Sequence, residues 1–381
     1  MKNLFFRRMA IKNKIVINLI QDLATPHNNV LIEQFARHSD IELKLWYASS
    51  GDSKRYPWRT NLSNEHGSSR IYGNIINLKF LWYCITSIHE RFILVGWMNQ
   101  NTIILHLCFF ILRRKFNHWT DLPNSNLQNR PLRKRLMRLF AYRILRLSRC
   151  KVLGVGRPTL NFFREMGFAD ATLVNLPIFV AINNNFSELR SYQKNYHNKY
   201  DVPINGILIS AGSRLIYEKG YDLLIDAIGR LPKDVIKRVK LVIVGSGDQS
   251  VALENQIISL SLDKAVYLEK WMEFKDFKSL IASSDIFIQP ARFDSYGGAA
   301  LGMSLEVAVI GSNSSGAAVD RIEHGQNGFL YEASDTVTLA TYISRLTMDA
   351  SLRAKIAKSG RYTSMQWPPS LGVDIIRDYT I

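Results

Sequence analysis

The sequence predicts an α/β protein with two parallel, doubly wound sheets. Short apolar runs typical of buried strands alternate with longer stretches of helical periodicity along the chain. A strand, a crossover helix and a second strand place the two strands in parallel, because the helix returns the chain to the same end of the sheet. The chain has 381 residues, more than one hydrophobic core usually serves, so two such domains are expected.

The domain boundaries follow from breaks in this alternation. The region around 183–205 is rich in Asn, Tyr, Lys and Ser and lacks a clear apolar period, which is typical of a linker. Trp367-Pro368-Pro369 interrupts the chain before a short terminal helix. We therefore predict an N-terminal domain at 1–185, a linker at 186–205, a C-terminal domain at 206–365 and a final helical segment at 366–381.

Each element of the N-terminal domain has a pattern of its own. Alternating or continuous apolar residues predict strands, and wider apolar spacing predicts helices. The predicted strands are 14–19, 41–47, 91–97, 115–118, 150–156 and 172–175, and the predicted helices are 29–37, 102–112, 132–149 and 159–166.

The composition limits where the protein is expected to act. Cys84, Cys108 and Cys150 are too few and too far apart for a disulfide framework or a zinc cluster, which suits a reducing compartment. The apolar run 102–112 is about half of the ~20 residues that a membrane span needs. The first residues carry cations without a following apolar stretch or cleavage signal. We expect a cytoplasmic protein.

A formal charge of +17 calls for an acidic partner or surface. Between Arg130 and Arg149 the sequence has eight basic residues and no acidic one. On a helix, five cations share one side: Lys134, Arg135, Arg138, Arg146 and Arg149. Five apolar residues share the other: Leu132, Leu136, Leu139, Phe140 and Leu147.

This pattern predicts a basic amphipathic helix that packs its apolar face on its own domain and turns its cations to an anionic membrane surface. A solvated charged face is the open alternative. Nucleic acid would use the same charges for backbone contacts, but no nucleic-acid module or interleaved aromatic and basic pattern accompanies them, so no nucleic-acid partner is expected.

The segment from Gly212 to Leu224 has the pattern of an anion-binding turn. A buried strand precedes it, Gly212 permits close approach of the backbone, and a helix starts near Tyr221 with its free amides toward the turn. Arg214 offers a planar fork that matches phosphate oxygens, and Lys219 offers a compact cation. The pair suits a pyrophosphate, although an ordinary strand-to-helix turn has the same outline.

This segment resembles the donor-phosphate segment of retaining glycosyltransferases with the GT-B fold, in particular family 4, with its pattern G-R-L-x-x-x-K-G. A serine separates the glycine from Arg214 here, but the five-residue step to Lys219 is kept. Further similar segments follow in order at 241–247, 285–298, 309–312 and 323–330. Segments at 24–47, 95–97 and 159–167 are similar to a branch of the family that builds bacterial surface polysaccharides.

The resemblance implies two Rossmann-like domains facing a central cleft, with a C-terminal helix that crosses back to the N-terminal domain. It implies retaining transfer of a sugar from a nucleotide diphosphate sugar to a lipid-linked or saccharide acceptor, for lipopolysaccharide, O-antigen or capsule. A phosphate oxygen of the donor would take the acceptor proton, so no protein nucleophile is implied. We expect no metal and no cofactor, because two cations would stabilise the departing diphosphate.

The resemblance also implies which residues bind the nucleotide-sugar donor. Asp294 stands where the family has its first glutamate and would orient the donor sugar. The loop glycines and their aromatic neighbour would bind the donor, namely Gly212, Gly245, Gly247, Tyr296, Gly297 and Gly298. The family's second glutamate is Gly302 here, which removes an expected contact with the nucleotide ribose. Glu306, one helical turn further on, is the candidate substitute.

Loops at the carboxyl ends of parallel strands are the expected place for acceptor-side residues. His27, Trp119 and Asp121 occupy such positions, and His118 is a weaker candidate. Two rival functions remain open. Gly302 favours a catalytically weakened sugar-nucleotide binding partner of another transferase, and the same architecture also serves nucleotide-sugar epimerases.

Overall fold

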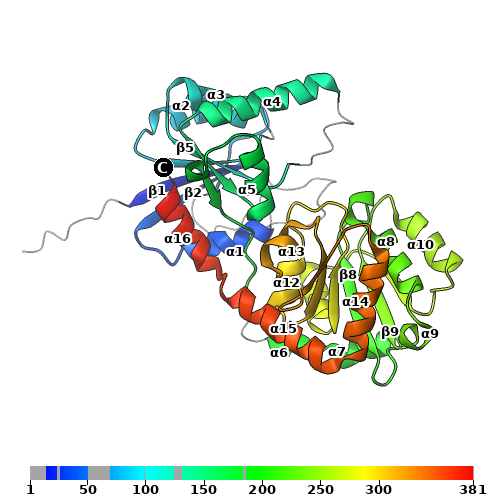
Figure 1. Cartoon of the computed structure of the whole chain (residues 1–381). Helices are drawn as coiled ribbons and strands as arrows, with labels where there is room; N and C mark the ends of the chain where they lie inside the picture. Colours follow the sequence, from blue (N-terminus) through cyan, green and yellow to red (C-terminus); the bar gives the residue numbers. More distant parts are fainter. Residues whose placement is uncertain are drawn as a thin grey trace, which may run out of the picture. The chain divides into compact units, whose positions relative to one another are not determined.

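The computed structural model describes residues 14–23, 26–49, 69–97, 99–123, 131–182 and 186–380. It contains two compact units, each built on a parallel sheet with helices packed against it (Figure 1). The first unit combines Met1–Trp119, Leu136–Val152 and Val373–Ile381, and the second combines Thr120–Arg135 and Leu153–Gly372. The predicted α/β class with two Rossmann-like sheets is confirmed.

The first sheet has seven strands in the order β3-β2-β1-β4-β5-β6-β7. Their bounds are β1 Ile15–Gln21, β2 Ile41–Tyr47, β3 Ser69–Ile71, β4 Arg91–Val95, β5 Phe116–Thr120, β6 Cys150–Gly154 and β7 Leu173–Asn175. β1 runs parallel to both of its neighbours, with Ile17 opposite Leu43 in β2 and Leu19 opposite Ile93 in β4. Such strands are covered on both faces, so they are nearly continuous apolar runs rather than alternating ones.

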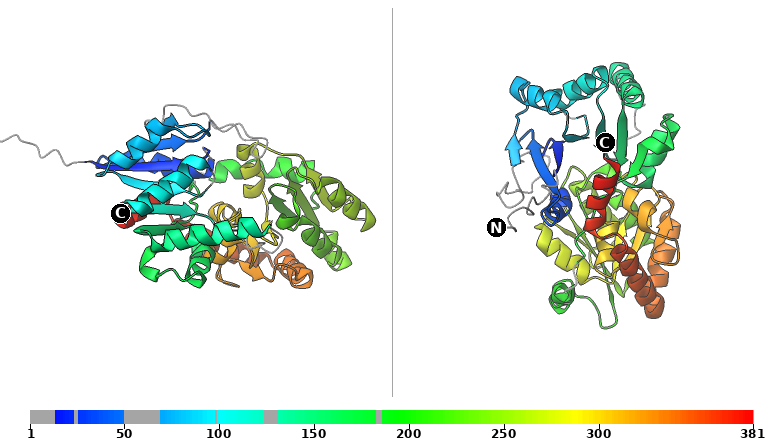
Figure 2. Two further views of the ribbon diagram at one scale, coloured as in Figure 1. Left: turned by 90° about the horizontal axis from the view of Figure 1, so that it is seen from above. Right: turned by 90° about the vertical axis from the view of Figure 1, so that its left-hand side faces the viewer.

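The helices of this part of the chain are α1 Pro26–Phe35, α2 Leu78–Thr86, α3 Gln100–Ile111, α4 Leu132–Leu147 and α5 Gly156–Glu165. Helices α2, α3 and α4 lie side by side along one face of the first sheet (Figures 1 and 2). The start of α3 is fixed by a capping box, in which Asn99 accepts from the backbone amide of Thr102 and the hydroxyl of Thr102 lies near the amide of Asn99.

The terminal helix α16, Pro369–Tyr379, contributes its second half to the first unit, as predicted for a helix that crosses back. Arg91 at the start of β4 holds it there. The guanidinium Nη1 of Arg91 donates to the carbonyl of Arg377 at 2.8 Å and to the hydroxyl of Thr380 at 3.2 Å.

The second sheet has six strands in the order β10-β9-β8-β11-β12-β13, and every neighbouring pair is parallel. The bounds are β8 Ile207–Gly212, β9 Val239–Val244, β10 Val266–Glu269, β11 Ile286–Gln289, β12 Ala308–Ser312 and β13 Phe329–Tyr331. The order of the strands reverses between β8 and β11. Loops that leave the two strands there diverge to opposite sides, and ligands bind at this position in open α/β sheets.

Helices cover both faces of this sheet. They are α6 Phe186–Arg190, α7 Gln193–Lys199, α8 Tyr221–Gly229, α9 Lys233–Ile236, α10 Ser250–Ser259, α11 Phe274–Ala282, α12 Ala299–Ser304, α13 Gly316–Arg321, α14 Thr336–Met348 and α15 Ala350–Met365. A core cluster of this unit contains Ile209, Leu241, Ile288 and Ile310 from four neighbouring strands, all essentially inaccessible to solvent. This rigid layer sets the positions of the loops at its carboxyl edge.

Two features differ from the sequence-based expectations. The segment predicted as a linker contains helices α6 and α7, and it is anchored by the buried ring of Tyr200, whose hydroxyl donates to Glu269 at 3.1 Å. A tyrosine-rich segment without apolar periodicity can still pack through its rings. The predicted division at 185 also differs from the compact units, because α5 packs against α13 although β6 and β7 belong to the first sheet.

The apolar face of α4 is a correction to the sequence analysis. Leu132, Leu136, Leu139, Phe140 and Leu147 are exposed, whereas Tyr142, Ile144 and Leu145 are the buried residues of this helix. The prediction that the apolar stripe packs on its own domain is therefore wrong. Only a short segment near the end of α4 packs into the core of the first unit. In the part of the chain that the structure describes, no helix is long and apolar enough to cross a membrane.

Two histidines are completely buried in the first unit. His106 on α3 places its Nδ1 at 2.6 Å from the carbonyl of Thr102 and its Nε2 at 3.0 Å from Nδ1 of His118 on β5. A carbonyl only accepts, so His106 donates from Nδ1 and His118 donates from Nδ1 to His106. Nε2 of His118 has no hydrogen-bond partner among the described residues. Trp97 stacks on the ring of His106 with centroids 4.1 Å apart.

Burial disfavours the charged form of both rings. It lowers the pKa of His106 to about 4 and the pKa of His118 well below its ordinary value. Because the unfolded chain binds protons near pH 6.5 and the fold does not, stability is complete above pH 6.5 and falls as the pH falls from there toward 4. We expect urea unfolding to show this loss between pH 7 and pH 5 and to show a smaller loss for His118→Gln. If the free energy of unfolding of His118→Gln depended on pH as strongly as that of the wild type, the loss of stability could not be assigned to His118.

Candidate active site

The loop after β8 rests on the loop after β9. The amide of Ser213 donates to the carbonyl of Val244 at 3.0 Å, and the amide of Leu215 donates to the carbonyl of Ser246 at 2.8 Å. A Cβ atom on Gly245 would lie 1.9 Å from the carbonyl oxygen of Ser213, and one on Gly247 would lie 2.1 Å from that of Leu215. These two glycines are therefore required by the close approach of the two loops, which positions the residues around Arg214.

Lys219 and Asp294 form an ion pair at the point where the strand order reverses. Nζ of Lys219 lies 2.6 Å from Oδ2 of Asp294, and the side chains are only 14% and 13% exposed. Two further donors hold the carboxylate: Nε2 of Gln289 at 3.2 Å from Oδ2, and the amide of Tyr296 at 3.3 Å from Oδ1. The structure thus brings together the lysine and the carboxylate that the sequence analysis selected from segments 75 residues apart.

A second pair fixes the same two segments to each other. Nη1 and Nη2 of Arg292 donate to the two carboxylate oxygens of Asp222, each at 2.6 Å. The guanidinium also lies over the ring of Tyr217, with Cζ 4.1 Å from the ring centroid. The hydrogen bonds to Asp222 raise the pKa of Arg292. The amide of Phe293 also donates to the carbonyl of Glu218 at 3.0 Å. Arg292 and Asp222 were missed in the sequence, where each looks like an ordinary surface charge.

Gly220 makes the turn into α8 possible. Its φ is +69°, in the left-handed region that favours glycine, and a Cβ there would lie 2.2 Å from the carbonyl oxygen of Pro290. Directly after it, the hydroxyl of Tyr221 lies 2.6 Å from that of Ser213, so the two ends of the loop are joined. Burial raises the pKa of Tyr221, with a smaller contribution from the negative charge of Asp294.

Arg214 lies in this loop, and its side chain differs from that of Lys219 in its contacts. Its side chain is half-buried, and among the described residues it makes no hydrogen bond or ion pair. Arg292 of the same unit, by contrast, is paired with Asp222. A guanidinium that is partly withdrawn from water and has no protein acceptor is available for an anionic ligand.

The loop after β11 is shaped from inside by Tyr296. Its ring is buried, and its hydroxyl accepts from Nε and Nη2 of Arg321 at 3.2 and 3.1 Å. Burial raises the pKa of Tyr296 to about 12, against a smaller opposing effect of Arg321. The guanidinium of Arg321 in turn lies over the ring of Trp367 at 3.8 Å. Tyr296 therefore supports the loop from within, and Arg321 was not recognised in the sequence.

Gly297 and Gly298 lead from this loop into α12. The side chain of Gln289 occupies the space beside Gly297, where an added Cβ would overlap its amide nitrogen. The oxygen of the same side chain accepts from the amide of Ala299 at 2.8 Å, so this amide at the start of α12 is already used. Gly212, the other loop glycine, lies against the ring of Phe277.

Gly302 and Glu306 have neighbours other than the Lys219 and Asp294 pair. Gly302 is buried in α12, and a Cβ there would lie 3.0 Å from Phe287 and from Val309, so a longer side chain would displace them. Glu306 follows the opposite end of α12, where its carboxylate lies 4.0 Å from Arg190 and 3.8 Å from Arg361. The structure does not bring Glu306 to the Lys219 and Asp294 pair.

The acceptor-side candidates of the sequence are dispersed. Trp119 on β5 and His118 are buried, and Asp121 is exposed just beyond the strand. His27 lies in α1, and its side chain is outside the described residues. The predicted cations of α4 and its end are exposed except Arg138, which is half-buried.

A polar cluster that the sequence analysis missed lies where the first sheet reverses its order, between β1 and β4. Nδ2 of Asn99 donates to Asp22 and, at 2.6 Å, to the hydroxyl of Tyr72. Burial raises the pKa of Asp22. Asp22 follows β1 and Asn99 precedes α3, so only the topology of the sheet brings them together. Within the described ranges, no group of three or more His, Cys, Asp or Glu is arranged to hold a metal ion.

Comparison with known structures defines the class of fold. Anabaena HepE, solved in complex with UDP, superposes with a TM-score of 0.74 at 19% identity, over 96% of this chain and 97% of that chain. WaaG, titled a glycosyltransferase involved in lipopolysaccharide biosynthesis, gives a TM-score of 0.67 at 16% identity, over 96% and 100%. The fold is that of the GT-B glycosyltransferases, as the sequence predicted.

Comparison of sequences then finds a family match for part of the chain. Residues 193–363 match the model of the family described as glycosyl transferases group 1. LpsE of Rhizobium meliloti, named a lipopolysaccharide core biosynthesis glycosyltransferase, is 25% identical over 165 residues, 43% of this chain and 46% of the relative. CapM of Staphylococcus aureus, named a capsular polysaccharide biosynthesis glycosyltransferase, is 27% identical over 206 residues, 53% and 50%.

The chain thus spans about half the length of the curated relatives it matches. The resemblance stated from the sequence is confirmed over residues 193–363, which lie in the second unit.

The contact between the loops after β8 and β9 leads to a test. We expect Gly245→Ala to lower the free energy of unfolding by about 1 to 3 kcal/mol, because the new methyl group overpacks the contact with Ser213. The matched control is Gly229→Ala at the end of α8, where the Cβ would meet Leu260 at an ordinary 3.5 Å. This control should be neutral or slightly stabilising. Equal effects in urea unfolding would contradict the role given to Gly245.

Proposed function

We propose that the protein is a retaining glycosyltransferase that moves a sugar from a nucleotide diphosphate sugar to a lipid-linked or saccharide acceptor in the biosynthesis of lipopolysaccharide, O-antigen or capsule. One observation carries the proposal. Arg214 is half-buried and its side chain has no hydrogen bond or ion pair with the residues that the structure describes. It and the Lys219–Asp294 ion pair belong to loops at the point where the second sheet reverses its order. This is the expected place for a phosphorylated ligand in such a sheet.

The departing diphosphate gains negative charge when the bond to the sugar breaks. Arg214 would bind it through its planar fork, and Lys219 would contribute the N–H groups that Asp294 does not use, since an ammonium has three donors. Both cations are held before the reaction, so little reorganisation is needed when the charge develops. No metal or cofactor enters this proposal.

Asp294 would orient the donor sugar. Its carboxylate accepts from Lys219, Gln289 and the amide of Tyr296, which leaves acceptor capacity for one sugar hydroxyl. A carboxylate neutralised by an ion pair is a weak nucleophile, which agrees with an orienting role. The acceptor proton would then pass to a phosphate oxygen of the donor on the same face of the sugar.

Relatives support a nucleotide sugar without deciding the base. One structure of HepE is described as a complex with UDP-glucose, and a relative from Corynebacterium glutamicum is named as GDP-mannose-dependent. We place acceptor-binding residues of the first unit at His27 and at the cluster of Asp22, Asn99 and Tyr72, and we keep Asp121, just beyond β5, as a further acceptor-side candidate. Buried polar groups that end at a sheet edge are suited to binding sugar hydroxyls.

We also propose a peripheral position on the cytoplasmic face of a membrane. The exposed cations Lys134, Arg135, Arg146 and Arg149 would be attracted to anionic lipids, at about 1 kcal/mol per cation near the surface.

A second candidate function is supported by Gly302. A protein that binds the sugar nucleotide and assists another transferase would tolerate the loss of the ribose contact that the family's second glutamate provides. The packing of Phe287 and Val309 around Gly302 favours this candidate, because a glutamate side chain at this position would have to displace them. The two functions differ in turnover, not in nucleotide binding.

We expect Arg214→Ala and Lys219→Ala each to lower kcat at least about tenfold in transfer or donor hydrolysis with UDP- and GDP-sugars, which is roughly 1.4 kcal/mol of transition-state stabilisation. Lys237→Ala removes an exposed cation on the same unit and should leave kcat unchanged. Smaller losses than this in both site variants would overturn the transition-state role.

Thermal unfolding with nucleoside diphosphates separates the two candidates. A ligand at about 100 times its Kd stabilises the native state by ~2.7 kcal/mol, so binding is detected without turnover. Stabilisation with no transfer to any acceptor would favour the binding partner, and no stabilisation by any nucleotide would reject both.

The electrostatic part of the membrane proposal predicts a salt dependence. Binding to vesicles that contain phosphatidylglycerol should weaken as salt rises, and Arg135→Glu with Arg149→Glu should weaken it further, because exposed charges are screened beyond about 10 Å at 0.1 M salt. Sedimentation with vesicles measures both effects. Indifference to salt and to the charge reversal would contradict an attraction between these cations and anionic lipids.

A further inference from the structure

Three neighbouring helices of the first unit turn apolar side chains to solvent. On each of them the buried residues occupy one side and the exposed apolar residues occupy the opposite side, at the spacing of helical turns. These exposed residues are Leu78 and Trp82 on α2, Ile103, Leu107 and Ile111 on α3, and Leu136, Leu139, Phe140 and Leu147 on α4. We call this set the apolar platform.

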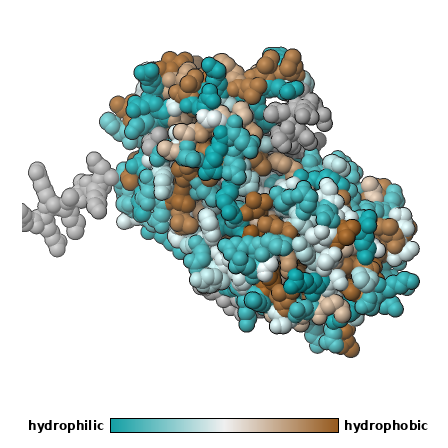
Figure 3. Space-filling view, viewed as in Figure 1, coloured by the Kyte–Doolittle hydropathy of each residue, from teal (hydrophilic) through white to brown (hydrophobic). Residues whose placement is uncertain are grey.

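The three apolar stripes lie on the same side of the first unit. α2 packs against α3, and α4 lies beside α3 on the same face of the sheet in each view (Figures 1 and 2). Hydrophobic residues gather along the same side of this unit in the space-filling view (Figure 3). Single exposed apolar residues need no explanation, but three aligned stripes mark an interaction surface.

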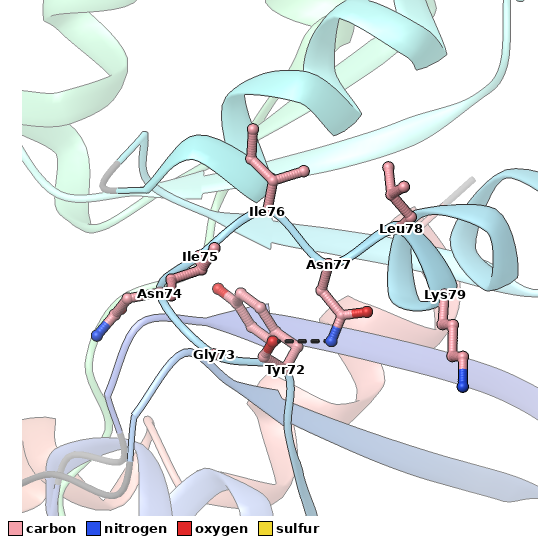
Figure 4. A pocket seen from close by; sticks show the side chains of 8 residues that line it. All are labelled: Tyr72, Gly73, Asn74, Ile75, Ile76, Asn77, Leu78 and Lys79. Carbon is pink, nitrogen blue, oxygen red and sulfur yellow. Dashed lines mark hydrogen bonds between the residues drawn. The ribbon is translucent and has the colours of Figure 1, made fainter.

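A hollow of about 530 Å³ extends the platform at the start of α2 (Figure 4). It is lined by residues 72–79, and the side-chain Nδ2 of Asn77 donates to the carbonyl of Tyr72 at 3.0 Å. Ile76 and Leu78 point to the same side of this segment, and Lys79 points to the other side (Figure 4). The apolar surface therefore continues beyond the helix and has a cation at its border.

The charges around the platform select its partner. The sequences of α2, α3 and α4 contain no aspartate or glutamate. Exposed cations stand around the apolar residues, among them Lys79, Arg113 and Arg143. Two copies joined through this face would bring like charges together, which is unfavourable. An anionic lipid layer matches both the cations and the apolar side chains, since its headgroups can pair with the cations and its acyl region can bury the apolar side chains.

We propose that the apolar platform inserts into the outer part of an anionic lipid layer, with Trp82 and Phe140 as its principal anchors. Aromatic rings are preferred at the boundary between headgroups and acyl chains, and these two rings are 70% and 64% exposed. The role of such docking rests on the proposed function, because a lipid-linked acceptor would then be reached from the same surface. The docking itself does not require that the protein transfers sugars.

The full chain is tested by sedimentation with vesicles that contain phosphatidylglycerol and with vesicles of phosphatidylcholine alone. We expect Trp82→Ser with Phe140→Ser to weaken binding to the anionic vesicles by at least about tenfold, because both anchors are removed. The matched control is Val251→Ser with Ile258→Ser on α10, where the side chains are equally exposed, at 67% and 68%, but lie outside the platform. The control should bind as the wild type does.

Vesicle binding at high salt distinguishes insertion of the apolar platform from electrostatic attraction of the cations. Part of the wild-type binding should persist at high salt, because apolar burial is not screened, and this residual binding should be absent in the platform variant. Equal binding of the platform variant and the wild type would overturn the proposal. A wild-type dimer in analytical ultracentrifugation that the platform variant dissociates, without vesicle binding, would also overturn it and would assign the surface to a second copy.

The outcome is independent of the catalytic assignment. Both double variants replace exposed side chains, so thermal unfolding and donor hydrolysis in the absence of vesicles should match the wild type. Vesicle binding without donor hydrolysis would retain the platform and reject the transferase, and hydrolysis without vesicle binding would do the reverse.

Discussion

The ion pair between Lys219 and Asp294 is the constraint on which the second unit's site depends. It joins the loop after β8 to the loop after β11, and it does so in a place with little solvent, where a lone charge of either sign would be costly. Gln289 and the amide of Tyr296 complete the environment of the carboxylate. The loops can therefore present a cation and a carboxylate in fixed positions before any ligand arrives.

The surrounding structure serves to keep these two loops together. The fork of Arg292 on Asp222 repeats the connection outside the ion pair, and Gly220 allows the turn to approach Pro290 closely. Tyr296 and Arg321 support the second loop from inside. Arg214 stands apart from this network, because among the described residues its charge has no protein partner. Fixed loops beside a guanidinium that has no acceptor among the described residues are suited to binding an anion.

The first unit shows where sequence patterns reach their limit. The alternation along α4 correctly indicated an amphipathic helix, but it could not tell which side faces the core. Core packing uses Tyr142, Ile144 and Leu145 near its end, so the remaining apolar side is exposed. The same holds for Asp22 and Asn99, whose contact depends on β1 and β4 being neighbours in the sheet. Neither residue belongs to a local motif.

The sequence by itself determined the alternation of strands and helices and the turn from Gly212 to Tyr221 with its Lys219, because these follow from local periodicity and turn chemistry, whereas Asp294 was chosen from the resemblance to family 4. Only the tertiary structure decided that Glu306 lies with Arg190 and Arg361, that Tyr296 is internal, and that three helices share an exposed apolar side. The physical reason is that the direction of a side chain depends on what packs against the opposite side of its element. That neighbour comes from a distant part of the chain.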